Sequence, residues 1–145
     1  MRVLRNWLLA RPNRHIVHRV LSQAPYAVSV STLGLARAGP ADVVIAKSPS
    51  SFTGWAGLVQ ARPAGLPFVL EVRDLWPQLF IEMGMIRNPV LVKSAAGLEW
   101  LLYRSADAIV TVTEWFREII VKRGLDRERV AVIPHGVDQI GRAHV

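Results

Sequence analysis

The sequence predicts an α/β fold, a parallel sheet with helices on both of its faces. From residue 41 onward, short apolar runs rich in β-branched residues recur between turn residues, and such runs are typical of strands buried on both faces. Stretches with helical features separate these runs, so that strand and helix alternate along the chain. This alternation is the pattern of a parallel α/β sheet flanked by helices and predicts a Rossmann-like arrangement.

The bounds of the elements follow from turn residues and apolar spacing. The predicted strands are residues 42–46, 67–72, 107–112 and 130–133. The predicted helices are residues 52–62, a segment from 77 to about 83, and residues 91–104 and 113–123. In the third of these helices, apolar residues recur at helical spacing at Leu91, Ala95, Leu98 and Leu102. Thr113 is suited to cap the last helix, and Gly124 to end it.

Composition excludes several classes of protein. The 145 residues suggest one domain or a piece of one, and 51% hydrophobic residues with 20% charged ones argue against intrinsic disorder. The absence of cysteine excludes disulfides, thiolate zinc sites and a cysteine nucleophile. No uncharged apolar run reaches the roughly 18 residues that a transmembrane helix needs, so we expect a soluble or peripheral protein. His15 and His18 lie at helical spacing but lack further ligands, so no metal site is predicted.

The net charge of +7 is concentrated at one end of the chain. Residues 1–41 contain six arginines and no acidic residue, whereas basic and acidic residues nearly balance in the rest. Three interpretations remain open: a transit peptide, a scaffold helix with a basic polar face, and a membrane-surface segment, which Pro12 would divide into two helices. In the third interpretation, anionic headgroups would be contacted by Arg2, Arg5, Arg11, Arg14 and Arg19. Arginines confined to one segment do not predict a nucleic-acid partner.

The candidate ligand site lies in the loops that follow the strands, because ligands of such sheets bind outside the carboxyl ends of the strands. Arg73 offers a forked cation for a phosphate or carboxylate, and Asp74 could accept a proton or bind sugar hydroxyls. Ser48 supplies a hydroxyl at a helix start, and His135 with Gly136 follows the last strand. Simpler interpretations stay open for each loop: a helix cap at Asp74 and plain turns at the other two.

Five stretches stand out in order along the chain: residues 67–77 (PFVLEVRDLWP), Gly84 with Asn88-Pro89, and residues 98–110 (LEWLLYRSADAIV), 113–118 (TEWFRE) and 132–138 (VIPHGVD). Together they resemble the amino-terminal domain of family 4 glycosyltransferases. The resemblance covers roughly residues 41–138. It is greatest to the bacterial branch that adds amino- or deoxy-sugars to lipid-linked precursors of surface polysaccharides.

The resemblance implies a GT-B architecture, in which two Rossmann-like domains face each other across a cleft. In that family the amino-terminal domain mainly holds the acceptor, the second domain holds the nucleotide sugar, and neither a cofactor nor a metal is obligatory. Arg73 and Asp74 correspond to a His-Asp pair of many relatives. An arginine cannot serve as a neutral base, so here it is expected to bind a phosphate or an oxyanion. His135 and Gly136 correspond to the family's Asn-Gly, and no catalytic residue is assigned.

The expected function is therefore that of a retaining glycosyltransferase. It would transfer a sugar from a nucleotide sugar to a lipid-linked glycan acceptor in cell-surface polysaccharide biosynthesis. Its expected location is the cytoplasm, peripheral on the inner face of the bacterial plasma membrane. The alternative is a non-catalytic Rossmann-like module that binds a nucleotide, a phosphate or a partner.

The expected organisation has three parts. Residues 1–40 form a basic helical segment of the same domain, and residues 41–138 form a partial amino-terminal domain. Residues 139–145 resemble the translation of a sequencing adapter and are expected to be a non-native tail. Under this interpretation the chain is truncated at both ends, lacks the donor-binding half and is inactive alone.

Overall fold

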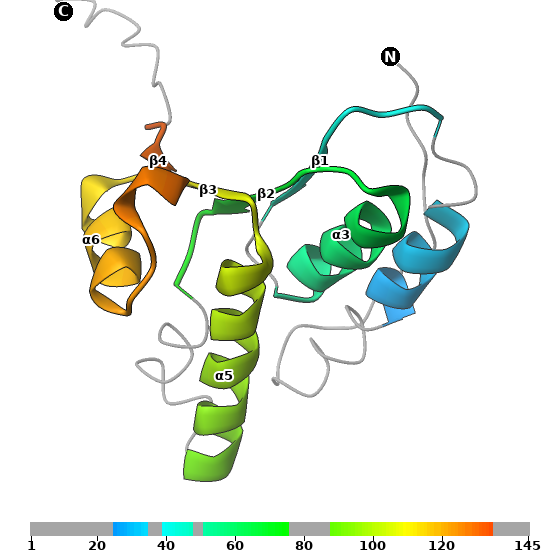
Figure 1. Cartoon of the computed structure of the whole chain (residues 1–145). Coiled ribbons are helices and arrows are strands. Elements are labelled where there is room, and N and C mark those ends of the chain that lie inside the picture. Colours follow the sequence, from blue (N-terminus) through cyan, green and yellow to red (C-terminus); the bar gives the residue numbers. More distant parts are fainter. Residues whose placement is uncertain (1–24, 35–38, 48–50, 76–87, 135–145) are drawn as a thin grey trace, which may run out of the picture.

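A four-stranded parallel sheet forms the centre of the protein (Figure 1). The computed structural model describes residues 25–34, 39–47, 51–75 and 88–134. The strands lie side by side in chain order, as β1 (Val44–Lys47), β2 (Phe68–Val72), β3 (Ala108–Thr111) and β4 (Val130–Val132). All three neighbouring pairs are parallel. The predicted α/β fold with a Rossmann-like parallel sheet is confirmed, and each strand lies within about two residues of its predicted bounds.

Helices connect the strands. The chain runs from β1 through α3 (Ser51–Ala64) to β2, through α5 (Pro89–Ser105) to β3, and through α6 (Glu114–Lys122) and a 3₁₀ turn, η2 (Arg127–Arg129), to β4. A π-helical turn, η1 (Val30–Gly34), precedes the sheet and lies against α3. The predicted helix from 77 to about 83 and the predicted helices before residue 25 lie outside the described residues.

Local signals set the ends of these helices. The side chain of Asn88 caps α5 by accepting a hydrogen bond from the backbone N–H of Val90 at 2.9 Å. As predicted, Thr113 caps α6, and its hydroxyl oxygen accepts a hydrogen bond from the N–H of Phe116 at 3.2 Å. Gly124 follows α6 with a φ of 100°, a left-handed conformation that glycine adopts without a Cβ clash.

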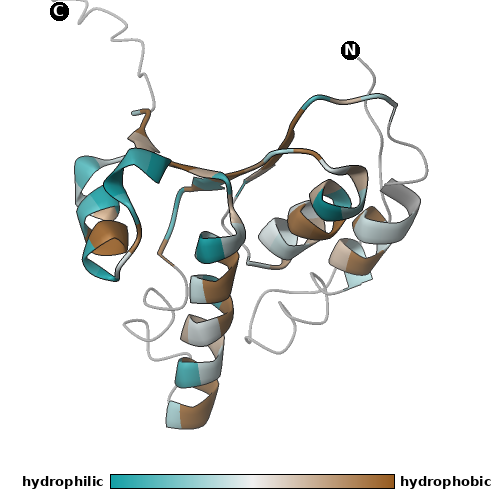
Figure 2. Ribbon diagram, in the orientation of Figure 1, coloured by the Kyte–Doolittle hydropathy of each residue, from teal (hydrophilic) through white to brown (hydrophobic). Residues whose placement is uncertain are grey.

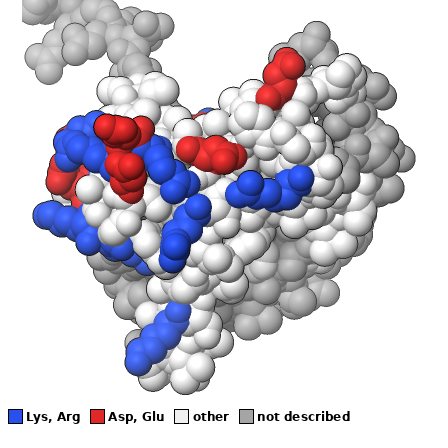
Figure 3. Space-filling view, in the orientation of Figure 1, with Lys and Arg blue, Asp and Glu red and all other residues white. Residues whose placement is uncertain are grey.

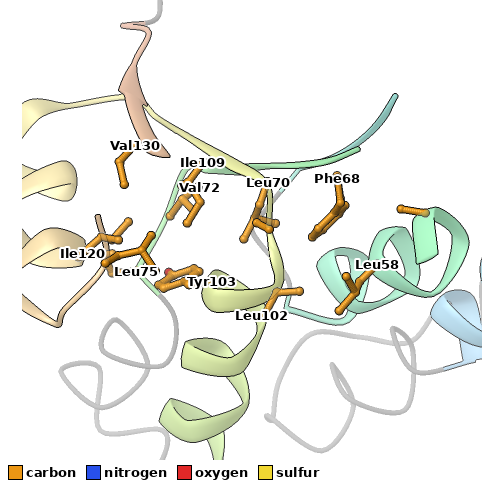
Figure 4. Close-up of a cluster of buried hydrophobic side chains, with 14 residues drawn as sticks. Leu58, Phe68, Leu70, Val72, Leu75, Leu102, Tyr103, Ile109, Ile120 and Val130 are labelled. Atoms are coloured by element: carbon orange, nitrogen blue, oxygen red, sulfur yellow. The ribbon is translucent and has the colours of Figure 1, made fainter. Parts of the chain in front are cut away.

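The hydrophobic core fills the space between one face of the sheet and the helices (Figure 4). Burial alternates along the strands: Phe68, Leu70 and Val72 of β2 are buried, whereas the residues between them are partly exposed. Ile109 of β3 continues this buried face across the sheet. The helices contribute apolar side chains to the same layer, including Leu58, Ala61, Leu102 and Ile120.

The opposite face of the sheet is open in the part of the chain that the structure describes, where α3, α5 and α6 all lie on the same side (Figure 1). The prediction of helices on both faces and of strands buried on both faces is therefore wrong for these residues. Ile45 of β1 is 65% exposed, and Ala131 of β4 is exposed as well. Successive strand side chains point to opposite faces, so only one of two β-branched neighbours reaches the helix layer.

Helix α5 contacts the core mainly with its last turns. Its amino-terminal end projects away from the sheet (Figure 1), and apolar residues line one of its sides (Figure 2). Of the four residues predicted at helical spacing, Leu102 is buried, whereas Leu91 and Leu98 are 60% and 52% exposed. The buried residues of α5 are Glu99, Leu102 and Tyr103.

Helix α3 carries two buried glycines at positions where a side chain would not fit. A Cβ added at Gly57 would come within 2.7 Å of the Cβ of Ala46 in β1. A Cβ added at Gly54 would come within 2.5 Å of a methyl group of Leu102 in α5. Gly57 therefore allows α3 to approach β1, the strand that leads into the first candidate loop, and Gly54 allows α3 to approach α5.

Candidate functional site

The carboxyl ends of the four parallel strands meet at one edge of the sheet, as predicted for the candidate site. Arg73 and Asp74 come directly after β2 and lie at this edge. Ser48, His135 and Gly136 lie outside the described residues, as do the proposed membrane-contacting arginines Arg2, Arg5, Arg11, Arg14 and Arg19. Of the predicted site, the structure therefore places the Arg-Asp pair.

The Arg73–Asp74 pair is held between two buried residues. Val72 before it and Leu75 after it are 1% and 8% exposed, whereas Arg73 is exposed and Asp74 is half-buried. Within the described residues, neither charged side chain has a hydrogen-bond or ion-pair partner. An exposed guanidinium without a carboxylate partner can bind a phosphate or carboxylate through two parallel N–H donors.

A polar cluster lies in the same core as Leu75, the residue that follows the Arg-Asp pair. Leu75 and Tyr103 are both members of the buried core cluster (Figure 4). The Tyr103 hydroxyl donates a hydrogen bond to Oε1 of Glu99 at 2.8 Å, and Nη1 of Arg123 donates one to Oε2 at 2.9 Å. The Glu99 side chain is only 4% exposed, and the Arg123 guanidinium lies 5.8 Å from the centre of the Trp100 ring.

The buried Glu99 carboxylate accepts a hydrogen bond on each of its two oxygens, from Tyr103 and from Arg123. Burial, followed by the neighbouring Glu99 carboxylate, raises the pKa of the Tyr103 phenol above its usual value. The phenol therefore stays protonated and acts as a hydrogen-bond donor to Glu99. This cluster was not among the features predicted from the sequence. Its signal in the sequence is a glutamate four residues before a tyrosine on the buried side of a helix, a spacing that places both on one face.

A second ion pair, which the sequence analysis also missed, lies at the strand ends themselves. Lys47, the last residue of β1, is in register with Glu71 of β2, and the Lys47 Nζ lies 3.4 Å from Oε1 of Glu71. The Lys47 side chain is 51% exposed and that of Glu71 is 21% exposed. Strand register, which the sequence does not show directly, brings these two residues together.

The charges of α6 and η2 are largely paired with one another (Figure 3). Arg127 contacts Glu118 at 2.8 Å and Glu114 at 3.1 Å, and Arg117 also pairs with Glu114. The hydrogen bond from Arg127 lowers the pKa of the Glu118 carboxyl. In this part of the surface, basic and acidic side chains alternate and form no single-sign patch.

The described residues contain neither a membrane-spanning helix nor a metal-binding cluster. Among the described helices, none has the length and apolar character required to span a bilayer. In the same parts of the chain, no three His, Cys, Asp or Glu side chains gather in a way that could hold a metal ion.

The family model of the glycosyl transferase 4-like domain matches residues 1–136. The chain belongs to this family. As a glycosyl transferase 4-like domain, it carries the α/β Rossmann-like sheet that is consistent with a domain of a GT-B glycosyltransferase. The match begins at residue 1, well before the stretch that carried the resemblance, and therefore includes the basic segment. Residues 139–145 lie beyond the match, and their origin stays a prediction. No curated protein matches the chain.

Proposed function

We propose that the chain is the acceptor-side domain of a longer, retaining glycosyltransferase. This enzyme would transfer a sugar from a nucleotide sugar to a lipid-linked glycan acceptor in cell-surface polysaccharide biosynthesis. The observation that carries the proposal is the exposed Arg73, which has no ion-pair partner among the described residues, beside Asp74 at the carboxyl end of β2, in a chain that belongs to the glycosyl transferase 4-like family. That edge is where parallel α/β sheets bind ligands.

The two side chains have complementary chemistry for such a substrate. Arg73 offers a planar fork of N–H donors to a phosphate oxygen or to an oxyanion that develops during transfer. It holds its proton throughout the physiological pH range and therefore positions and stabilises charge rather than acting as a base. Asp74 can accept hydrogen bonds from sugar hydroxyls. In this proposal the nucleotide sugar is a co-substrate, and the transfer needs no resident metal or cofactor.

The proposed location is the cytoplasmic face of the bacterial plasma membrane, where lipid-linked acceptors are available to a peripheral enzyme. The excess of arginine over acidic residues in residues 1–41 supports this proposal. Each basic side chain near an anionic membrane surface contributes about 1 kcal/mol of attraction. Neither the chemistry nor the charge distribution calls for nucleic acid as a partner.

Donor binding tests the proposed division of labour. Isothermal titration calorimetry with a panel of nucleotide sugars would compare this chain with a version extended through a second Rossmann-like domain. We expect the extended chain to bind one donor at least about tenfold more tightly than the 145-residue chain does, because the second domain supplies the nucleotide site. Equally tight donor binding by both chains would contradict the proposal and would favour a nucleotide-binding module.

A further inference from the structure

The open face of the sheet carries charge only at its carboxyl end. Among the described strand residues, that face contains Lys47 and Glu71, and its other members are apolar: Ile45, Val69, Ala108, Val110 and Ala131. The row formed by Ile45, Val69 and Ala108 lies before the charged row in the strand direction. The ion pair therefore lies at the carboxyl ends of the strands, where Arg73 follows β2.

The stability of the sheet does not explain this pair. An ion pair between partly exposed side chains contributes about 0–1 kcal/mol, because solvent screens it and two long side chains lose freedom. The separation of 3.4 Å between Lys47 Nζ and Glu71 Oε1 is loose, and half of the Lys47 side chain remains exposed. The ammonium group therefore has donors left for a second anion while Glu71 holds it over the strand ends.

A second cation, Arg73, lies close in the chain to Glu71, the partner of Lys47. Arg73 follows Glu71 by two residues, a span of about 7 Å in extended backbone. Lys47 is paired with Glu71 at the end of β1, and Arg73 directly follows the end of β2, so the two cations come from the ends of two adjacent strands. A compact ammonium and a forked guanidinium are the two cations that proteins use for phosphate groups. Glu71 and Asp74, which balance their charge, supply acceptors for hydroxyl groups.

We propose that Lys47, held by Glu71, joins Arg73 in binding the diphosphate of a sugar-bearing diphosphate ester. Mixed cations and carboxylates suit a ligand that presents phosphate and sugar hydroxyls together. The proposal rests on the proposed function for the identity of the ligand. That ligand is the lipid-linked acceptor or the nucleotide sugar, which share this chemistry.

Pyrophosphate binding by the 145-residue chain tests the site. The probe is inorganic pyrophosphate, titrated by calorimetry at constant ionic strength. Lys47→Ala is expected to weaken binding by at least about fivefold, and Lys47→Arg, which keeps the charge, by less than about twofold. The matched control is Lys93→Ala, because Lys93 is an exposed lysine near the far end of α5. It should change binding by less than about twofold.

Each other outcome overturns the proposal. Equal affinity of Lys47→Ala and the unchanged chain would show that Lys47 only protects the sheet edge, a known use of lysine on edge strands. Equal losses in Lys47→Ala and Lys93→Ala would show that binding depends on net charge alone. No pyrophosphate binding by the unchanged chain would also overturn it. Circular dichroism of each variant checks that the sheet is intact.

Two further ligands distinguish the sources of the diphosphate. The unchanged chain and Lys47→Ala are each titrated with two ligands. A sugar diphosphate on a short prenyl chain represents the acceptor, and a nucleoside diphosphate represents the donor. The ligand that loses more affinity in Lys47→Ala is the one that the site binds. Equal losses support recognition of the shared diphosphate. Lys47-dependent pyrophosphate binding in a protein whose extended form transfers no sugar would keep this site and overturn the proposed function. Sugar transfer by the extended protein together with pyrophosphate binding that does not depend on Lys47 would keep the proposed function and overturn this site.

Discussion

Replacing Glu99 with alanine is expected to lower the free energy of unfolding by about 2–3 kcal/mol. The substitution leaves the buried hydroxyl of Tyr103 without its acceptor and Arg123 without its carboxylate. Removing the partner of a buried polar group costs more than the hydrogen bond contributes, because the Tyr103 hydroxyl stays desolvated without an acceptor. The expected loss is below the largest values for such pairs, since the Arg123 side chain is 35% exposed and regains some hydration. Urea unfolding followed by tryptophan fluorescence measures it.

Glu118→Ala is the matched control for Glu99. Glu118 also forms a hydrogen-bonded ion pair with an arginine, at 2.8 Å, but on the surface of α6. Solvent screening makes such a pair nearly neutral for stability, so the urea midpoint of this variant should match that of the unchanged chain. Similar losses in the two variants would show that burial of Glu99 does not set its importance.

Gly57→Val is expected to destabilise the fold by about 3 kcal/mol. A Cβ at this position would lie 2.7 Å from the Cβ of Ala46 and 3.0 Å from the ring of Phe68, so α3 would have to move away from β1. Ala46 cannot rotate out of the way, and Phe68 is fully buried. The gain in helix propensity on replacing glycine with valine, about 0.3 kcal/mol, offsets only a small part of this cost.

Replacing a glycine on the exposed side of α5 is expected to stabilise the fold rather than destabilise it. A Cβ added at Gly97 meets no atom within 4 Å, so Gly97→Ala should raise the free energy of unfolding by about 0.5–1 kcal/mol. Thermal unfolding of both glycine variants under the same conditions gives the comparison. Stabilisation by Gly57→Val would contradict the close packing of α3 on β1, and destabilisation by Gly97→Ala would contradict the open space around Gly97.

The elements that could be predicted from the sequence are those with local causes. The strands are short apolar runs between turn residues, and Thr113 caps α6 through a hydroxyl and an N–H three residues apart. Arg73 and Asp74 fall at a strand end for the same reason, because the end of the apolar run of β2 marks the start of the loop.

Features that depend on tertiary placement could not be predicted. The Lys47–Glu71 pair exists because β1 and β2 align in one particular register, and neither residue stands out in its own segment. The Glu99–Arg123 pair joins α5 to the end of α6, two segments that the sequence analysis treated separately. The open sheet face follows from which side the connecting helices occupy, and apolar alternation in a strand does not specify that side.

Sugar transfer tests the central claim most directly. The reading frame extended beyond this chain would be incubated with radiolabelled nucleotide sugars and membranes that contain lipid-linked acceptors, and the label in the lipid extract would be counted. We predict label in the lipid fraction, with a rate lowered about tenfold by Arg73→Ala and unchanged by substitution of Arg104, an exposed arginine near the carboxyl end of α5. The claim would be contradicted if no nucleotide sugar labelled the lipid, or if Arg73→Ala transferred sugar at the unchanged rate.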